Sequence, residues 1–285
     1  MLVDKTVSFF TVCYEKDWEK ILKENRIGTL ISNCNFPFNE KVLIINNVKN
    51  RKLVEGYAIE AVNNKIIDKY YFSEDFSEKL LSTFCIRRKS FVLDTYDGYW
   101  YSIGPLSAVY CCQSKYLLYF TGDCMVPLSN SPWIQDAIEV FESNSTILTA
   151  NPVWDNKIQE AIDESFSEDS KWCYSYGFSD QCFLLEKSRL YGDVYNYYHP
   201  ASERYPMYGG NIFERRILCY MRCKNLHRIT RKDIYYTHIK LLSDSYSKEV
   251  PKKSLAKKFR KIVANLLKKR RIMMKTYFSK NTSAI

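Results

Sequence analysis

The chain has 285 residues, of which 46% are hydrophobic and 26% are charged. This length and composition suit one large folded domain, with or without an appendage, and argue against a disordered chain. The formal net charge is +10, but residues 246–285 hold 13 Lys and Arg against one acid, Glu249, which leaves 29 basic and 31 acidic residues elsewhere. We therefore predict a nearly neutral body over residues 1–245 and a basic tail over residues 246–285. The neutral body argues against a nucleic-acid-binding protein.

The cysteines and the apolar runs indicate the cellular compartment. The ten cysteines include no Cys-x-x-Cys pair, and several, such as Cys13 and Cys219, lie in apolar runs. We expect reduced, buried thiols of a cytoplasmic protein and neither a disulfide framework nor a zinc site. The start, Met-Leu-Val-Asp-Lys, lacks the pattern of a secretory signal, and no apolar run approaches the ~18 residues of a membrane-spanning helix.

The first part of the chain alternates strand and helix patterns. β-branched and aromatic runs predict strands, and amphipathic spacing predicts helices. Strands are expected at residues 6–14, 41–48 and 70–72, and helices at 15–25 (ended by Gly28), from about 57, and at 106–114. This alternation predicts an α/β fold with a largely parallel sheet.

The next stretch, residues 116–126, carries an acid at the end of an apolar run. Tyr-Leu-Leu-Tyr-Phe leads into Thr121-Gly122 and then Asp123, which predicts a buried strand with a carboxylate at its tip. Open α/β sheets bind ligands beyond the carboxyl ends of their strands. The alternative is that Asp123 only closes a turn after the strand.

The second half continues the pattern. An amphipathic helix is expected at 132–143, a strand at 146–150 closed by Asn151-Pro152, a helix starting at Ser179 or Asp180, a helix at 212–224, and a last strand at 228–240.

The tail has a pattern of its own from Pro251 onward. Leu255, Phe259, Ile262 and Leu266 recur at helical spacing before the run Lys268-Lys269-Arg270-Arg271. This pattern predicts a basic amphipathic helix, which suits an anionic membrane surface. A solvated tail, or a helix docked on the body, stays open because periodicity does not distinguish lipid from protein.

Taken in order, these features resemble a known family. A first strand, Leu-Leu-Tyr-Phe-Thr-Gly-Asp, then Phe-Ser-Asp-Gln, and a late strand ending in Tyr-Thr-His are similar to glycosyltransferases of the GT-A fold and, more loosely, to bacterial enzymes that build surface polysaccharide. The resemblance covers residues 5–240. It implies a Rossmann-like, mostly parallel central sheet flanked by helices. It also implies transfer of a sugar from a nucleotide-sugar donor to a glycan or lipid-linked acceptor.

The resemblance implies a metal and diphosphate site. Asp123 matches the last acid of the family's Asp-x-Asp motif, which holds Mn²⁺ or Mg²⁺ against the phosphates of the donor. Thr121 occupies the place of the first acid and contributes no charge. His238 resembles a late His that serves some members as a second metal ligand. The alternative for His238 is a partly buried structural residue beside Tyr236.

It also implies a catalytic base. Asp180 matches the acceptor-side carboxylate that deprotonates the attacking hydroxyl in inverting members. The alternative is that Asp180 caps a helix. Glu203 is a second catalytic candidate, with Asp163 and Glu164 as further fallback bases. Arg215 and Arg216 are candidates for neutralising phosphate, unless they lie on a solvated helix face.

The nucleotide-sugar pocket is expected near the ends of the first strands. The positions that match the family are Thr11, Tyr14, Asn46, Tyr101, Ser107, Thr121, Gly122 and Asp123.

Two other function classes stay open. A nucleotidyltransferase would share the α/β body, but it usually carries a Gly-rich phosphate loop, and residues 11–20 contain no glycine. A non-enzymatic protein would use the basic tail to bind nucleic acid or membrane. For the transferase we expect a cytoplasmic protein, peripheral on the inner face of the plasma membrane.

Overall fold

The computed structural model describes residues 6–92, 96–204 and 210–238. The predicted tail over residues 246–285, its amphipathic helix and the boundary at residue 245 lie outside the described residues. Within the described ranges, none of the helices combines the length and the apolar character needed to cross a membrane.

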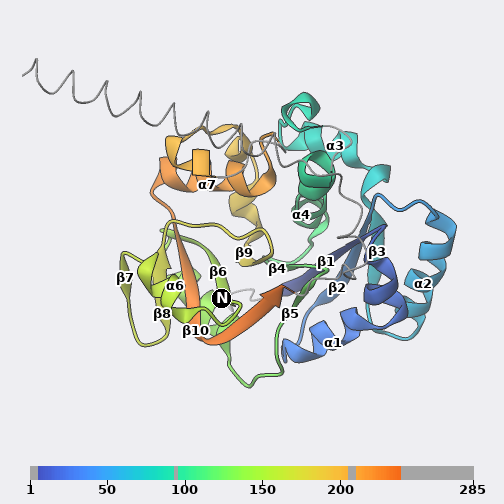
Figure 1. The fold of residues 1–285 in the computed structure, drawn as a ribbon, viewed down its shortest axis with the longest axis horizontal. Helices are drawn as coiled ribbons and strands as arrows, with labels where there is room; N and C mark the ends of the chain where they lie inside the picture. Colours follow the sequence, from blue (N-terminus) through green and yellow to red (C-terminus); the bar gives the residue numbers. More distant parts are fainter. Residues whose placement is uncertain (1–5, 93–95, 205–209, 239–285) are drawn as a thin grey trace, which may run out of the picture. The chain divides into compact units, whose positions relative to one another are not determined.

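The described chain is built on a ten-stranded sheet in the order β3-β2-β1-β4-β9-β6-β10-β8-β7, with β5 paired to β10 (Figure 1). β3, β2, β1 and β4 run parallel, and β9 lies antiparallel between β4 and β6, which in turn is parallel to β10. This mostly parallel α/β sheet confirms the predicted fold class. The strands are β1 (Val7–Tyr14), β2 (Glu40–Asn46), β3 (Lys69–Phe72), β4 (Tyr116–Thr121), β5 (Cys124–Met125), β6 (Ile147–Trp154), β7 (Ser167–Glu168), β8 (Trp172–Ser175), β9 (Cys182–Glu186) and β10 (His227–His238).

Helices cover both faces of the sheet (Figure 1). They are α1 (Arg26–Asn33), α2 (Arg51–Asn63), α3 (Ser77–Thr83), α4 (Tyr101–Cys111), α5 (Trp133–Ser143), α6 (Ile158–Asp163) and α7 (Phe213–Lys224). Short π-helical segments occur at Glu19–Lys23 and Tyr96–Trp100. Single 3₁₀ turns occur at Ser73–Asp75, Arg88–Ser90, Lys187–Leu190, Val194–Asn196 and Pro200–Arg204.

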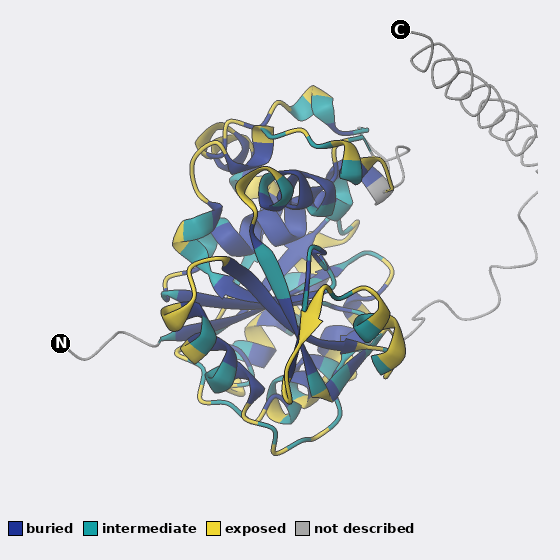
Figure 2. Ribbon diagram, turned by 90° about the vertical axis from the view of Figure 1, so that its left-hand side faces the viewer, coloured by how far each residue is buried: buried dark blue, intermediate teal, exposed yellow. Residues whose placement is uncertain are grey.

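The core follows from the alternation of side chains along each strand. In β1, Phe10 packs with α3, α4 and α7 on one face, whereas Phe9 packs with α1 and α5 on the other. In β2, Leu43 and Ile45 face α2. Both phenylalanines are fully buried, which stabilises the fold by roughly 1.5–3 kcal/mol each. Figure 2 shows that the central strands are largely buried, so most of the sheet is core. A ligand site is therefore expected at the edges of the sheet.

Three helices differ from their predicted limits. α2 begins at Arg51 and α4 at Tyr101, so both start earlier than expected, and α4 contains Pro105. The prediction that Gly28 ends a helix is wrong, because Gly28 lies inside α1. A Cβ at Gly28 would lie 2.5 Å from Oδ1 of Asn25, the residue that precedes α1 with a positive φ. The glycine therefore serves this close approach and not a helix end.

The strand that was expected to close at Asn151-Pro152 continues through them to Trp154 as β6. Pro152 lies opposite Arg231, and the pairing of β6 with β10 shifts register directly after it. A proline is tolerated there because such an irregularity relaxes the need for regular ladder hydrogen bonds.

The helix predicted to start at Ser179 or Asp180 is also wrong. Residues 176–181 form the connection between β8 and β9. Asp180 therefore does not cap a helix, which excludes the structural alternative for this residue.

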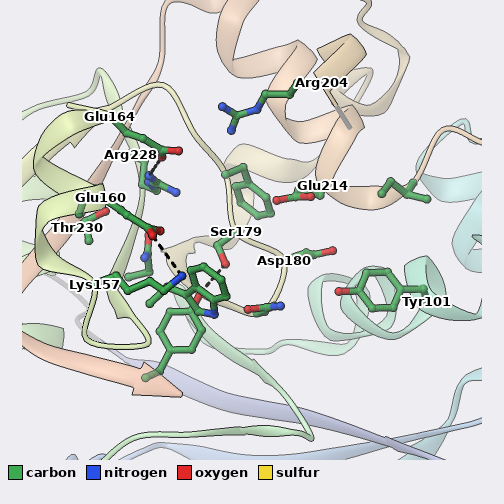
Figure 3. A pocket seen from close by; sticks show the side chains of 17 residues that line it. Tyr101, Lys157, Glu160, Glu164, Ser179, Asp180, Arg204, Glu214, Arg228 and Thr230 are labelled. Atoms are coloured by element: carbon green, nitrogen blue, oxygen red, sulfur yellow. Dashed lines mark hydrogen bonds and ion pairs between the residues drawn. The ribbon is translucent and has the colours of Figure 1, made fainter. Parts of the chain in front are cut away.

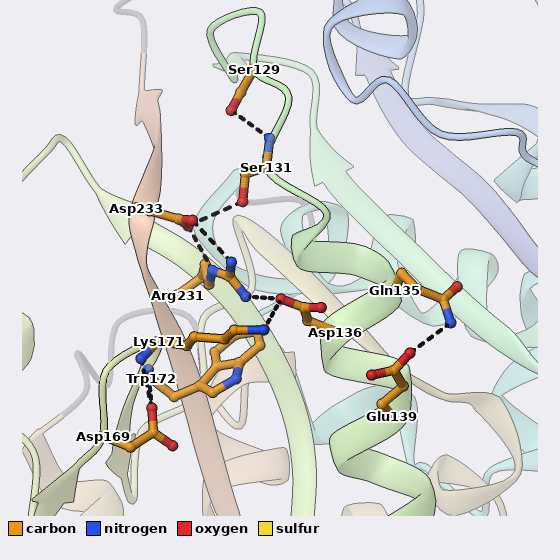
Figure 4. Close-up of polar contacts among 10 residues, drawn as sticks. All are labelled: Ser129, Ser131, Gln135, Asp136, Glu139, Asp169, Lys171, Trp172, Arg231 and Asp233. Atoms are coloured by element: carbon orange, nitrogen blue, oxygen red, sulfur yellow. Dashed lines mark hydrogen bonds and ion pairs between the residues drawn. The ribbon is translucent and has the colours of Figure 1, made fainter.

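A buried arginine ties β10 to α5 (Figure 4). Arg231 is 3% exposed, and its guanidinium donates to both carboxylate oxygens of Asp233 (2.6 and 2.9 Å) and to Asp136. Lys171 donates a further hydrogen bond of 3.0 Å to Asp136. These contacts lower the pKa of Asp136 in spite of its partial burial. The network fixes β10, the strand that ends at His238.

We expect Arg231→Met to lower the free energy of unfolding by roughly 3–5 kcal/mol, because it leaves two carboxylates without their buried partner. Arg51→Met is the matched control. Arg51 pairs with Asp75 at the surface, where both side chains are about half exposed, and such pairs contribute only about 0–1 kcal/mol. Urea unfolding of both variants measures the difference, and equal losses would contradict a stabilising role for the buried network.

Candidate functional site

The carboxyl ends of the parallel strands meet at one edge of the sheet. β1 ends at Tyr14, β2 at Asn46, β4 at Thr121 and β10 at His238. In open α/β sheets this edge is where ligands bind. The structure therefore brings together several of the positions that the sequence marked.

Asp123 and His238 form a pair at this edge. Asp123 lies in the turn between β4 and β5, and β5 pairs antiparallel with β10 so that His238 lies opposite Cys124. His238 Nε2 is 2.7 Å from Asp123 Oδ2, and both side chains are partly exposed. The hydrogen bond to Asp123 raises the pKa of His238. The pairing of β5 with β10 explains how residues 115 positions apart come into contact.

The pair suits a divalent ion whose coordination is completed by a bound ligand. Among the described residues, no group of three or more His, Cys, Asp and Glu side chains is placed to hold a metal. Mg²⁺ and similar ions are commonly bound by one or two carboxylates together with substrate phosphates and water. Asp123 and His238 therefore suit an ion shared with a diphosphate, and they do not form a closed protein cage.

Asp180 is a buried carboxylate close to this pair. It is 6% exposed, and burial raises its pKa to about 6, although a hydrogen bond from Tyr101 lowers it. The negative charge of Asp123 raises the pKa further and the charge of His238 lowers it. A carboxyl group with such a pKa can accept a proton near neutral pH.

The sheet itself places Asp180 beside Asp123. β4 and β9 are antiparallel neighbours with Phe120 opposite Cys182, and the Thr121 N–H donates to the Gln181 carbonyl (2.8 Å). The chain entering β9 therefore runs past the end of β4. The Ser179 hydroxyl is 3.0 Å from that of Tyr236 in β10, which holds the connection on its other side.

A cavity of about 480 Å³ opens in front of Asp180 (Figure 3). Its walls combine aromatic faces with charged groups of both signs. Lys157 pairs with Glu160 at 3.2 Å, and Arg228 pairs with Glu164 at 3.4 Å. Aromatic and charged residues that line it are Tyr101, Trp154, Phe178, Tyr236, Lys157, Glu160, Glu164, Asp180, Arg204, Glu214 and Arg228.

The predicted nucleotide residues differ in how far they are buried. Tyr14 and Tyr101 are half-buried near the edge. Asn46 is buried, with its amide donating to the Trp100 carbonyl (2.6 Å) and accepting from Ser73 (3.1 Å).

Thr11 and Ser107 are closed off in this structure. Both side chains are buried, and neither hydroxyl has a hydrogen-bond partner among the described residues. We do not include them in the proposed site. Thr121 accompanies Asp123, and its hydroxyl is 3.1 Å from the Cys124 sulfur.

Glu203 does not join the cavity. It is exposed on a 3₁₀ turn and accepts a hydrogen bond from Tyr198 (3.1 Å), whereas its neighbour Arg204 lines the cavity wall. Of the other fallback bases, Glu164 lines the cavity and Asp163 is exposed on α6 outside its lining. The geometry favours Asp180 among these acids.

Sequence reasoning missed two features of the edge. Asp17, just after β1, is 4% exposed; burial raises its pKa, and the charge of Asp123 adds to the effect. Trp154 ends β6 with 40% exposure, and the Lys157 ammonium lies 4.1 Å from its ring centre. A signal for Asp17 was its position just beyond the first strand. Trp154 was hidden because the strand was expected to end four residues earlier.

Gly122 leaves no room for a side chain in the turn that carries Asp123. A Cβ there would overlap the Val12 carbonyl oxygen and the Ile21 side chain. We expect Gly122→Ala to destabilise the fold by about 1–3 kcal/mol and to displace Asp123. Gly56→Ala in α2 is the control, because nothing lies near its Cβ position, and this change should stabilise the helix by about 0.5–1 kcal/mol. Thermal unfolding of both variants tests this, and a neutral Gly122→Ala would contradict the close approach.

Comparisons with known proteins show likeness at the level of fold. Neither a protein-family model nor a curated protein matches the chain. Among solved structures, the crystal structure of GalNAc-T7 with UDP, GalNAc and Mn²⁺ is similar with a TM-score of 0.48 and 14% identity, over 84% of this chain and 44% of that one. S. aureus TarS is similar with a TM-score of 0.45 and 13% identity, over 84% of this chain and 37% of that one. A structure of TarS 1-349 gives a TM-score of 0.44 and 13% identity, over 82% and 60%.

The chain thus spans less than two thirds of the length of these structures. At such identities the likeness concerns the fold alone.

Proposed function

We propose that the protein is a glycosyltransferase that moves a sugar from a nucleotide-sugar donor to a glycan or lipid-linked acceptor. One arrangement carries the proposal: Asp180, a buried carboxylate that lines the cavity, interacts electrostatically with the Asp123–His238 pair at the carboxyl edge of the sheet. The arrangement supplies a base next to a place for a charged leaving group.

In this proposal Asp123 and His238 hold the donor diphosphate through Mn²⁺ or Mg²⁺. The ion would supply positive charge to the leaving diphosphate. Tyr14 at the end of β1 is expected to contact the nucleotide, with Thr121 and Gly122 shaping the turn beneath the phosphates.

The acceptor occupies the cavity, and Asp180 accepts the proton of its attacking hydroxyl. The bond from that oxygen to the anomeric carbon forms as the bond to the diphosphate oxygen breaks. Tyr101 donates a hydrogen bond to Asp180 and so orients the carboxylate. The exposed ring of Trp154 and the nearby charged pairs suit the apolar face and the hydroxyls of a sugar.

A thermal-shift panel of nucleoside diphosphates, with and without Mn²⁺, tests donor binding. A ligand at 100 times its Kd stabilises the native state by about 2.7 kcal/mol, which raises the melting temperature by several degrees in a domain of this size. The expected result is a rise with one nucleotide that increases with Mn²⁺. No response to any nucleotide would overturn the proposal.

We further propose that the tail holds the enzyme on the inner face of the plasma membrane, on the sequence pattern alone. Replacing Lys268, Lys269, Arg270 and Arg271 by Gln in the full chain should weaken sedimentation with anionic vesicles strongly, because each basic residue near the surface contributes about 1 kcal/mol. Neutral vesicles are the control and should bind neither form. Unchanged binding of the substituted chain to anionic vesicles would reject this anchor.

A further inference from the structure

A second cavity lies apart from the proposed active site. It has a volume of about 440 Å³ and lies between the segment after α3 and the first turns of α7. It shares no lining residue with the first cavity. Among the described residues that line it, three are arginines and none is Asp or Glu. Its main polar residues are Arg87, Arg215, Arg216, Tyr195, Tyr197 and Asn211.

Arg216 carries a buried charge without an acidic partner. It is 5% exposed, and it donates to the carbonyls of Asn211 (2.6 Å) and Tyr195 (3.0 Å) and to the Ser90 hydroxyl. All three acceptors are neutral, and within the described residues no carboxylate forms an ion pair with Arg216. A guanidinium has five N–H donors, so these bonds position the group without using every donor. Burial lowers its pKa to about 10, which agrees with an uncompensated charge.

The neighbours add charge and polar groups to the same cavity. Arg215 is 6% exposed and donates to the Ser202 hydroxyl (3.3 Å), and Arg87 adds an exposed guanidinium. The hydroxyl of Tyr195, 1% exposed, has no hydrogen-bond partner among the described residues. Buried charges are normally paired, and the buried guanidinium of Arg216, which has only neutral acceptors among the described residues, is costly unless an anion binds.

We propose that this cavity binds the phosphate monoester group of a ligand, at a site separate from the donor diphosphate. A phosphate monoester carries about −1.5 to −2 charges and accepts bidentate hydrogen bonds from guanidinium groups. The cavity is larger than a phosphate group needs, and its tyrosine and asparagine walls suit the polar body attached to the phosphate. The sequence had marked Arg215 and Arg216 as phosphate ligands or as a solvated face; their burial removes the second alternative.

Calorimetric titration of the full chain with inorganic phosphate, glucose 1-phosphate and glucose tests the site. Glucose 1-phosphate should bind more tightly than inorganic phosphate, and glucose should not bind. Arg87→Ala should weaken binding roughly tenfold, because charge-assisted hydrogen bonds are lost. Lys89→Ala is the matched control, since Lys89 is also exposed and basic but does not line the cavity. Arg87 is exposed, so its variant is expected to fold. Arg216 is buried, so Arg216→Gln is a second test only where the variant folds.

A parallel measurement uses vesicles of neutral lipid containing phosphatidic acid, which presents the same group on a membrane. Binding of either source that depends on Arg87 and not on Lys89 supports the proposal and identifies the source. Equal loss in both variants, or no Arg87-dependent binding to any of the probes, would overturn it. Asp123→Ala must leave glucose 1-phosphate binding intact; its loss would mean that the phosphate occupies the donor site instead.

Discussion

Asp180→Asn is expected to lower kcat by roughly 10²–10⁴-fold, the range associated with loss of a general base. Asparagine keeps the size of the side chain and can still accept the hydrogen bond from Tyr101, but it cannot take a proton. Transfer from the donor to an acceptor, measured at saturating donor, reports the loss. Asp163→Asn, on the exposed surface of α6, is the matched control and should retain activity.

The pH dependence follows from the same group. Because burial raises the pKa of Asp180 to about 6, the wild-type rate should rise with pH through about 6, where the carboxyl group loses its proton.

The same raised pKa affects the stability of the fold. Burial disfavours the ionised carboxylate, so the free energy of unfolding falls as the pH rises from about 4 to about 6, and the full cost is present above pH 6. A rise from 3.8 to about 6 corresponds to about 3 kcal/mol, the most that Asp180→Asn should add to the free energy of unfolding at pH 8. A purely structural Asp180 would give a variant that is less stable and not more stable.

The parallel core could be predicted because its signals are local. The continuous apolar runs of β1, β2 and β4 have one stable location, the buried centre of a sheet, and each was placed within two residues. Gly28 and Pro152 misled the prediction because each has a structural role that its residue type does not signal. Gly28 makes space for Asn25, and Pro152 lies at a register shift that depends on β10.

The site could be predicted only where a residue type and a strand end coincide. Asp123 follows a continuous apolar strand, and His238 ends the last strand, so the sequence could mark both as candidates. Their contact depends on the pairing of β5 with β10, which no local pattern signals. The location of Asp180 depends on β9 running antiparallel to β4, and its raised pKa depends on burial that only the folded chain creates. Arg216 shows the same limit, because its sequence neighbours suggest an exposed helix face.

If Asp123 holds the ion as proposed, Asp123→Ala is expected to lower turnover at least about 10³-fold, because the loss of its charge removes several kcal/mol of stabilisation of the leaving diphosphate. The fold should survive. The side chain of Asp123 is partly exposed, and its pair with His238 contributes about 0–1 kcal/mol. The variant should therefore melt near the wild-type temperature without ligand and lose the Mn²⁺-dependent part of the shift caused by a nucleoside diphosphate.

Asp155→Ala tests whether the Mn²⁺ response needs the side chain of Asp123 itself or only negative charge at this edge of the sheet. Asp155 accepts a hydrogen bond from the His238 backbone N–H (3.2 Å) and lies one residue beyond β6. It is close to the same histidine but does not contact its imidazole in the described structure. If Asp155→Ala loses the Mn²⁺ response and Asp123→Ala keeps it, the ion is held elsewhere and the role of Asp123 is refuted. If only Asp123→Ala loses it, the strand-end carboxylate holds the ion, and His238→Gln should then weaken the response by a smaller factor because one ligand remains.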